Sequence, residues 1–457
     1  MSRPRINVKH GDECLVSHSG LLLVGHLLEA TDLRSLLAQL DIHCDQRKFT
    51  HADIAFAMMG LISIGKPNYD AIEAYRDNPV FFSSALGLSD CPSSATLRQR
   101  LELMSEESTC RLLREQSASL VRRKAPSISA LHTSAGSFIP LDIDVSPFDN
   151  SKTKKEGVSR TYKGCDGYAP IFAYLGTEGY LVNLELREGK QHCQKETPEF
   201  IKQTLEHVRA ITAERILMRL DSGNDSRDNF PSEEYPNVDF IIKRNLRKES
   251  LKAWLDRARE VGLEKPCRQG KRVWIGKTDI GIDGGKLPYP IVFEVTERTI
   301  IKGQLLVFPD IEVDTYWVSR KDLGAQEVID LYHDHGTSEQ FHSELKTDLD
   351  LERFPSGDFA TNELILHLGM LVYNMLRIIG QESLELSNGD GQIPQPRRKK
   401  VKRRRVRTVM QDLIYMAGRL IRTGRRWFIS FGRLNPFARL WEQLDLRLRM
   451  ATSTGQA

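Results

Sequence analysis

Residues 332–346 combine side chains that could act on a phosphate group. On a helix, with about 100° between successive residues, four polar side chains of this segment fall within an arc of about 60°. A carboxylate flanked by an ammonium, an imidazole and a phenol can bind a hard cation while its neighbours hold the phosphate. The alternative is a solvated helical face, and Gly336 is a poor residue for a helix interior. The four side chains are Tyr332, His335, Glu339 and Lys346.

Further carboxylates lie on two predicted strands. Residues 138–145 alternate between apolar and polar types, which places Asp142 and Asp144 on one face of a strand. Carboxylates inside a strand are costly unless they bind a cation or are paired. Asp221 closes a second predicted strand at 215–221, although an aspartate at a strand end commonly belongs to a turn.

The order of the predicted elements places these carboxylates together. Strands are expected at 138–145, 168–175, 180–187, 215–221 and 238–243, with a helix at 197–211 between the third and the fourth. This order predicts an α/β fold with a ribonuclease-H-like mixed sheet, in which the first and fourth strands are neighbours. Functional groups gather where neighbouring strands end. Asp144 and Asp221 are therefore expected side by side, and the helix of Glu339 must return to the same edge.

The remaining segments complete a five-part organisation. A helix at 251–261 and strand-like segments at 272–275, 291–296, 302–308 and 315–319 predict a β-rich insertion. Helical periodicity returns at 325–345 and 363–379. The predicted domains are a helical DNA-binding and dimerisation domain at 1–135, the first part of a catalytic core at 136–246, the insertion at 247–320, the second part of the core at 321–385, and a basic linker with C-terminal helices at 386–457.

Two basic features predict contact with nucleic acid. Pro92-Ser93-Ser94 precedes a Ser-capped helix that is expected to project Arg98 and Arg100, as a recognition helix does; the alternative is an ordinary bundle with exposed arginines. Residues 397–407 are almost wholly basic and follow a Gly/Pro-rich linker. Such a run binds polyanions by releasing counterions, and its alternative is a solvated tail. Its candidate DNA contacts are Arg403, Arg404 and Arg405.

The composition is that of an ordinary soluble protein. The 457 residues are 40% hydrophobic and 28% charged, with a net charge of +4. No apolar run of bilayer-spanning length is evident, and seven scattered cysteines without Cys-x-x-Cys spacing argue against a disulfide framework and against a zinc site. We expect a cytoplasmic protein.

The spacing of Tyr332, His335, Glu339 and Lys346 resembles the Tyr-Arg-Glu-Lys signature of insertion-sequence DDE transposases of the IS4 type, with His335 where the family usually has arginine. Residues 352–356 and 362–374 look like the IS1380 branch of that group. Two further motifs resemble those of the family: Asp144-Val145-Ser146 its Asp-x-Thr/Ser, and Asp221-Ser222-Gly223 its second aspartate motif.

The resemblance implies roles for these residues. Asp144, Asp221 and Glu339 would be the catalytic metal ligands for two Mg²⁺ ions, with Mn²⁺ as a substitute and Asp142 as the alternative first-strand ligand. Tyr332, His335 and Lys346 would contact the phosphates beside the scissile bond. Less direct candidates are Lys163 and Arg187 as phosphate contacts, and Trp274 and Trp317 for stacking on an extruded base, with core packing as the alternative for each tryptophan.

The implied activity is cut-and-paste DNA transposition. The enzyme would recognise double-stranded DNA at the terminal inverted repeats, hydrolyse a phosphodiester and use the new 3′-hydroxyl for strand transfer to target DNA. Two ends held together imply a homodimer, working at the bacterial nucleoid without contact with a membrane. The alternatives are a ribonuclease-H-like nuclease without strand transfer and a catalytically inactive, domesticated DNA-binding protein.

Overall fold

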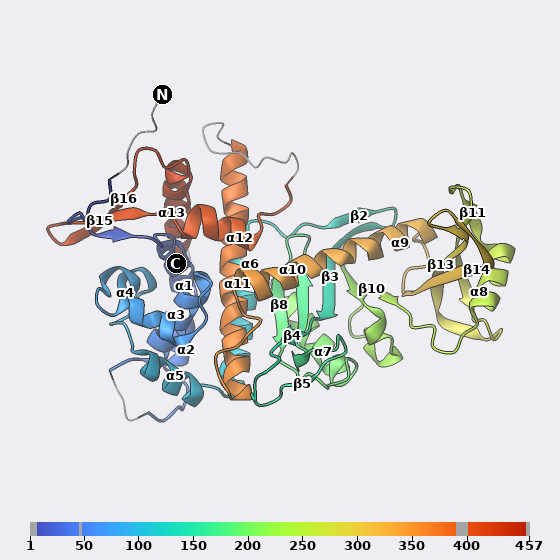
Figure 1. The fold of residues 1–457 in the computed structure, drawn as a ribbon, viewed down its shortest axis with the longest axis horizontal. Helices are drawn as coiled ribbons and strands as arrows, with labels where there is room; N and C mark the ends of the chain where they lie inside the picture. The colour runs from blue at the N-terminus through green and yellow to red at the C-terminus, as the bar shows by residue number, and fades with distance from the viewer. Residues whose placement is uncertain (1–6, 45–47, 390–400, 454–457) are drawn as a thin grey trace. The chain divides into compact units, whose positions relative to one another are not determined.

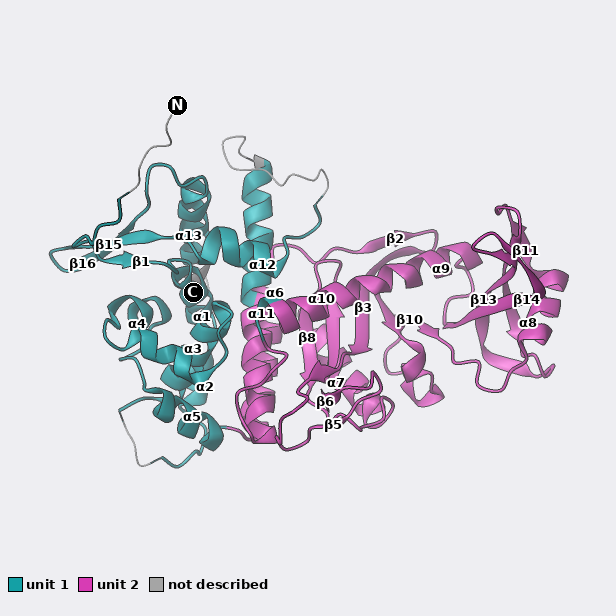
Figure 2. Cartoon of the chain, viewed as in Figure 1, with its two compact units in different colours: residues 1–104, 348–350, 375–457 teal, residues 105–347, 351–374 magenta. Residues whose placement is uncertain are grey.

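The computed structural model describes residues 7–44, 48–389 and 401–453. The chain divides into two compact units, coloured separately in Figure 2. Unit 1 comprises residues 1–104, 348–350 and 375–457, and unit 2 comprises residues 105–347 and 351–374.

The centre of unit 2 is a ten-stranded mixed sheet (Figure 1). Its strand β3 (Gly136–Val145) pairs antiparallel with β7 (Ile171–Leu175), which pairs with β8 (Tyr180–Glu185). On its other side β3 runs parallel to β9 (Ile216–Leu220), which runs parallel to β10 (Val238–Lys243). The predicted first and fourth strands are therefore neighbours, and the ribonuclease-H-like order is confirmed.

The insertion extends this same sheet. Strands β11 (Leu263–Lys265), β12 (Lys271–Ile280), β13 (Lys286–Ile301) and β14 (Gln304–Val318) follow one another, and β14 pairs antiparallel with β10. The segments predicted at 302–308 and 315–319 form one strand. It continues through its charged middle because β13 supplies both the ladder partner and Arg298, whose guanidinium pairs with Asp310 and Glu312.

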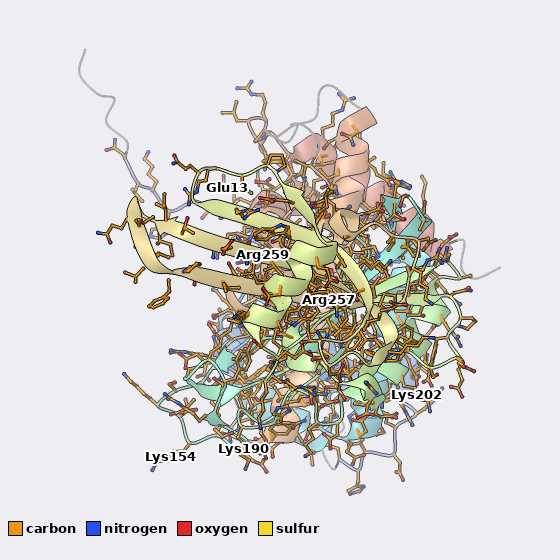
Figure 3. The ribbon with its side chains drawn as sticks, turned by 90° about the vertical axis from the view of Figure 1, so that its right-hand side faces the viewer. Glu13, Lys154, Lys190, Lys202, Arg257 and Arg259 are labelled. Carbon is orange, nitrogen blue, oxygen red and sulfur yellow. The ribbon has the colours of Figure 1, made fainter. Side chains whose placement is uncertain are left out.

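Helices cover both faces of the sheet. On one face lie α7 (Thr197–Ile211), whose apolar side chains share a core with alternate residues of β3, and α8 (Leu251–Val261), which packs on the insertion strands β12, β13 and β14. The opposite face is covered by α9 (Ala325–His333), which packs against Phe138 and Leu217. Figure 3 labels Arg257 and Arg259 on α8, and Arg259 pairs with Glu297 of β13 at 2.8 Å.

The predicted helix at 325–345 is continuous in extent but irregular in pitch. After α9 come the 3₁₀ turn η4 (Asp334–Thr337), α10 (Ser338–Ser343) and the π turn η5 (Glu344–Asp348). Gly336 lies in the 3₁₀ turn, which accords with its poor fit to an α-helix interior. The remaining elements of unit 2 are α6 (Glu107–Lys124), β2 (Leu131–Thr133), β4 (Phe148–Asp149), β5 (Ser159–Arg160), β6 (Asp166–Tyr168), η2 (Ser222–Asn224) and η3 (Arg227–Asn229).

The helix α11 (Phe359–Gly389) is long and apolar. Its residues up to 374 belong to unit 2 and the rest to unit 1. By length and composition it is the one helix of the described residues that could cross a membrane, which the sequence analysis did not expect, and 94% of its most apolar window is buried inside the protein. That burial is typical of a core helix.

Unit 1 combines the predicted N-terminal helices with a C-terminal segment. Thr50 and Asp53 form a capping box at the start of α3. Helices were predicted at the C-terminus, and a β-hairpin that was not predicted lies between them. The elements of the unit are β1 (Leu15–Val16), α1 (Leu21–Glu29), α2 (Leu33–Leu37), α3 (His51–Ser63), η1 (Tyr69–Tyr75), α4 (Val80–Leu86), α5 (Ser94–Leu103), α12 (Val406–Val409), η6 (Met410–Ile414), β15 (Gly418–Thr423), β16 (Arg426–Ser430) and α13 (Ala438–Ser453).

Candidate active site

The three predicted carboxylates line one pocket of about 780 Å³ in unit 2. Asp144 lies near the carboxyl end of β3, and Asp221 directly follows β9. Because β3 and β9 are parallel neighbours, these ends meet at one edge of the sheet. Glu339 comes from the first turn of α10, which belongs to the helical run that crosses the sheet (Figure 1). The predicted residues Tyr332, His335, Lys346 and Lys163 line the same pocket.

Asp142 does not line this pocket. Its side chain is buried, and Arg219 of β9 donates to both of its oxygens, at 2.6 and 2.8 Å. His335 Nδ1 lies 2.9 Å from the Oδ1 atom of Asp142. Burial by itself raises the pKa of Asp142, but the charges of Arg219 and His335 outweigh burial, so this pKa is lowered. Both oxygens of Asp142 are thus engaged within the protein.

The arginine partner of Asp142 also fixes the helical run. Arg219 Nη1 donates to the carbonyl oxygen of Leu331 at 2.6 Å. His335 then uses Nδ1 toward Asp142 and lines the pocket with the rest of its ring. Its Nε2 atom makes no hydrogen bond within the part of the chain that the structure describes. This nitrogen is the atom that His335 can offer to a phosphate.

His342 is a contact of Asp144 that the sequence analysis did not single out. Its Nε2 atom lies 3.1 Å from Asp144 Oδ2, and its Nδ1 atom lies 3.1 Å from the hydroxyl of Tyr174. Burial alone raises the pKa of Asp144, but the hydrogen bond and charge of His342, together with His335, outweigh it and lower this pKa. An ionised carboxylate only accepts hydrogen bonds, so Nε2 of His342 donates to Asp144. The spacing of seven residues from His335, one face of a helix, was the available signal.

Asp221 is in the opposite electrostatic situation. Burial, followed by the negative charge of Asp144, raises the pKa of Asp221, although Asn224 donates to its Oδ1 atom at 2.7 Å. Two carboxylates that share a desolvated site repel each other, and a cation between them removes that penalty. The donor set therefore fits a hard divalent cation, which prefers carboxylate oxygens.

The side chains of Asp144, Asp221 and Glu339 do not lie close enough together to bind one metal ion at the same time. Across residues 7–44, 48–389 and 401–453, no three His, Cys, Asp or Glu side chains are grouped closely enough to hold a metal ion. Asp144 contacts His342 and Asp221 contacts Asn224. Glu339 is exposed and makes no hydrogen bond or ion pair to another described residue. Coordination of one cation by all three therefore requires side-chain rotation.

The cationic and phenolic side chains around the pocket differ in exposure. Lys346 Nζ donates to the carbonyl oxygen of Pro147 at 2.5 Å, and burial lowers the pKa of Lys346. Burial and the nearby charge of Asp221 raise the pKa of Tyr332, which keeps its phenol protonated and able to donate. Lys163 is exposed, with its ammonium 6.0 Å from the ring centre of Tyr162.

Arg187 does not reach the pocket. Its side chain is 1% exposed, and its guanidinium donates to Glu185 at 2.6 Å and to Thr197 at 3.1 Å. Its predicted contact with phosphate was wrong, because its contacts with Glu185 and Thr197 hold the guanidinium inside the protein just beyond the end of β8. Trp274 and Trp317 are also buried, which agrees with the core-packing alternative for both.

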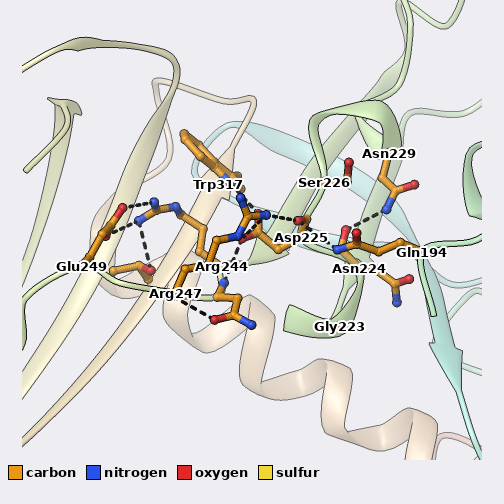
Figure 4. Close-up of polar contacts among 12 residues, drawn as sticks. Gln194, Gly223, Asn224, Asp225, Ser226, Asn229, Arg244, Arg247, Glu249 and Trp317 are labelled. Atoms are coloured by element: carbon orange, nitrogen blue, oxygen red, sulfur yellow. Dashed lines mark hydrogen bonds and ion pairs between the residues drawn. The ribbon is translucent and has the colours of Figure 1, made fainter. Parts of the chain in front are cut away.

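The loop that follows Asp221 is anchored to the insertion (Figure 4). Asp225 accepts from Trp317 Nε1 at 2.9 Å through one oxygen and from the backbone N–H of Asn245 at 3.0 Å through the other. The Arg244 guanidinium lies 4.7 Å from the Trp317 ring centre. These contacts fix the loop only four residues beyond a carboxylate of the pocket.

The predicted DNA contacts in unit 1 fall into two classes. Arg98 on α5 has a side chain that is 57% exposed. Arg100 is 3% exposed, and it donates to the carbonyl oxygen of Phe49 at 3.0 Å. The expectation that Arg100 projects from the helix was wrong, because positions 97, 100 and 101 share the face on which Leu97 and Leu101 are buried.

Three arginines at the C-terminal end of the basic run are paired with carboxylates inside unit 1. Arg405 donates to both oxygens of Asp348, at 2.8 and 3.1 Å, and Arg407 lies 3.1 Å from the same carboxylate. Arg404 is buried and lies 3.7 Å from Asp412. Arg403 is partly exposed. The first part of the run, residues 397–400, lies outside the described residues.

Comparison with known proteins assigns the family. The family model described as "Transposase DDE domain group 1" matches residues 1–453. Among solved structures, the chain is similar to the piggyBac transposase in a cryo-EM structure of its synaptic complex with hairpin DNA, at 12% sequence identity and a TM-score of 0.44, over 88% of this chain and 80% of that chain. No curated protein sequence matches the chain. On the family model alone, which spans nearly the whole sequence, the chain belongs to the transposase DDE domain group 1 family and is an enzyme of the DDE transposase class.

Proposed function

We propose that this transposase moves its own insertion sequence by a cut-and-paste route, and that it belongs to the IS1380 branch of the IS4 type. The observation that carries the proposal is the convergence of Asp144, Asp221 and Glu339 on one pocket from two parallel strands and one helix. Three carboxylates at the edge of a sheet suit phosphoryl transfer better than any other chemistry that these residue types support.

Asp144, Asp221 and Glu339 would hold two Mg²⁺ ions, with Mn²⁺ as a substitute. Ions bound there would stabilise the attacking and the leaving oxygen of a phosphodiester. His342 keeps Asp144 ionised and oriented through its Nε2–H. Lys346 and Tyr332, which line the pocket, would donate hydrogen bonds to phosphate oxygens, as would Nε2 of His335 when that ring is protonated.

The substrates would be double-stranded DNA, first at the terminal inverted repeats of the element and then at a target site. Strand transfer from two ends calls for a synaptic complex, and a homodimer is the simplest symmetric assembly that holds them. The enzyme would act on the bacterial nucleoid in the cytoplasm.

The decisive experiment is cleavage of a labelled duplex that carries one end of the element, with Mg²⁺, by the intact protein and by Glu339→Gln. The variant keeps the shape of the side chain but loses a ligand charge, so it should neither nick nor join the duplex while binding it as the intact protein does. Asp334→Asn is the matched control, because Asp334 is exposed on the same helical run outside the pocket lining.

Three other outcomes would overturn the proposal. Nicking without joining would identify a nuclease on this fold. Binding without cleavage by the intact protein would identify an inactive DNA-binding protein. Full activity of Glu339→Gln would remove Glu339 from the site.

A further inference from the structure

A β-hairpin near the C-terminus of unit 1 has no role in the proposed chemistry. We call residues 418–430 the arginine hairpin; it consists of β15, a turn at Gly424 and Arg425, and β16. At its base β1 pairs with β15, through Val16 opposite Gly418. Strand β16 forms the outer edge of this three-stranded sheet.

The sequence around the hairpin carries charge of one sign only. Residues 413–441 contain six arginines and no lysine, aspartate or glutamate. Four of the arginines lie in the hairpin and are exposed, and within the described residues none of these four forms an ion pair. By contrast, Arg404, Arg405 and Arg407 of the basic run are neutralised by Asp412 and Asp348. The four hairpin arginines are Arg419, Arg422, Arg425 and Arg426.

The hairpin is fixed at its base and free at its end. Leu420 is 9% exposed and pairs with the partly buried Ile429. Beyond this pair every residue from 422 to 428 is exposed, including Trp427 at 45% and Phe428 at 49%. In the view of Figure 2 the turn extends beyond the helices of unit 1. The free half is therefore a largely exposed two-stranded ribbon, in which Arg426, Trp427 and Phe428 also line a pocket of about 740 Å³ shared with α1, α4 and α13.

The side chains of the free half are sorted by face. Cross-strand pairing places Arg426 beside Thr423, and Phe428 beside Ile421, on the face that also carries Arg419. On the other face the Arg422 guanidinium lies 5.5 Å from the ring centre of its cross-strand partner Trp427. One face therefore presents guanidinium groups on both sides of an apolar centre.

We propose that the arginine hairpin enters a groove of duplex DNA and contacts its phosphates through Arg419, Arg425 and Arg426. A two-stranded antiparallel ribbon fits the major groove, which is about 12 Å wide. Each guanidinium group can donate two parallel hydrogen bonds to phosphate oxygens. Phe428, which lies between the arginines, can contact apolar base edges. The inference rests on the proposed function, because the partner is the DNA on which the enzyme would act.

The positive charge of the four hairpin arginines favours DNA over a second copy of this chain as the partner. An exposed edge strand with two aromatic residues could also pair with another copy of this chain. Two copies would, however, bring eight unpaired hairpin arginines together without a carboxylate in the segment, which is repulsive. A polyanion removes this repulsion.

The test compares the salt dependence of DNA binding for the full-length protein and for Arg419→Ala/Arg425→Ala/Arg426→Ala. Two labelled duplexes are used, one with the element's end and one of unrelated sequence. Arg422 is left in place because it contacts Trp427. Loss of three phosphate contacts should weaken binding to both duplexes and make the slope of log affinity against log salt shallower by about 2 to 3. The same three positions changed to lysine should retain the slope.

A charge-matched control removes three exposed lysines of unit 2, by Lys202→Ala/Lys252→Ala/Lys286→Ala. It should leave the slope near that of the intact protein. An unchanged slope in the hairpin variant, or an equal loss in the control, would overturn the inference. Loss of self-association by the hairpin variant, with DNA binding unchanged, would assign the hairpin to a protein interface instead.

Failure of this inference is distinguishable from failure of the proposed function. If the intact protein cuts DNA and the hairpin variant binds DNA as tightly as the intact protein, only the role of the hairpin is refuted. If the intact protein binds neither duplex, both the hairpin inference and the proposed function are refuted.

Discussion

His342 Nε2 donates a hydrogen bond to Asp144 Oδ2 across 3.1 Å, joining the helical run to strand β3 of the sheet. The other ring nitrogen contacts Tyr174 on β7, also at 3.1 Å. Three elements of unit 2 thus fix one carboxylate oxygen, and the second oxygen accepts from the backbone N–H of Val145. The orientation of Asp144 is therefore set by the protein before any ligand arrives.

The first prediction concerns His342 as a positioning residue. His342→Ala should raise the Mg²⁺ concentration needed for half-maximal DNA cleavage by about 10- to 100-fold, because a partner that orients a ligand contributes about that much to affinity. His342→Gln, which keeps a donor, should recover part of this, and Tyr174→Phe should change it less than His342→Ala. A lower maximal rate at an unchanged Mg²⁺ requirement would contradict the role.

A second prediction separates Asp142 from Asp144. Asp142→Ala leaves the buried guanidinium of Arg219 without its carboxylate and should lower the free energy of unfolding by about 3–5 kcal/mol, measured by urea denaturation. The double variant Asp142→Leu/Arg219→Met should recover most of the loss. A stable Asp142→Asn protein that binds DNA but does not cleave it would instead make Asp142 a metal ligand.

The third prediction concerns the pH dependence of stability. Burial, then the charges of Glu107 and Glu185, raises the pKa of Glu363 from 4.5 to about 7. Between these values the folded protein holds a proton that the unfolded chain has lost, so stability falls as pH rises through this window. Glu363→Gln should remove that part of the fall. Parallel stability curves for both proteins between pH 5 and 7 would be the contrary result.

His367, in the same part of unit 2, should make stability fall as pH is lowered, which is opposite to the effect of Glu363. Burial, then the charge of Arg114, lowers the pKa of His367 from 6.5 to about 3. The stability that this residue contributes is complete above pH 6.5 and is lost as pH falls toward 3. Comparing Glu363→Gln with the intact protein isolates the carboxyl group, since His367 is present in both.

The fourth prediction compares two arginines of one helix. Arg100→Ala should lower the free energy of unfolding by about 1–3 kcal/mol, since the carbonyl of Phe49 loses a buried donor. Arg98→Ala should change stability by less than about 0.5 kcal/mol. If α5 contacts DNA, only the Arg98 variant should reduce the salt slope of binding, by about 1. Equal slopes for Arg98→Ala and the intact protein would remove α5 from the DNA path.

Periodicity in the sequence was sufficient to predict the framework. The helices at 197–211 and 251–261 and the strand at 238–243 have the predicted bounds, because their apolar residues recur at the period of the element that buries them. The order of strands then placed Asp144 beside Asp221. The roles of these carboxylates stay predictions until cleavage is measured.

Contacts between side chains that are far apart in the sequence could not be predicted from periodicity. His342 and Asp144 are 198 residues apart, and Arg405 and Asp348 are 57 apart. A run of basic residues reveals its charge but not the carboxylates that fold against it. The hairpin at 418–430 did have a local signal, since Gly424 lies between two short apolar segments.

The pairing of β14 with β10 bears on any attempt to shorten this enzyme. Excising the insertion would strip β10 of its outer neighbour and leave a row of unpaired backbone groups open to other chains. Asp225 would also lose Trp317, and with it one support of the loop that follows Asp221. A minimal version of the enzyme would therefore need a replacement edge strand. The insertion is thus a structural part of the sheet that carries the candidate catalytic carboxylates.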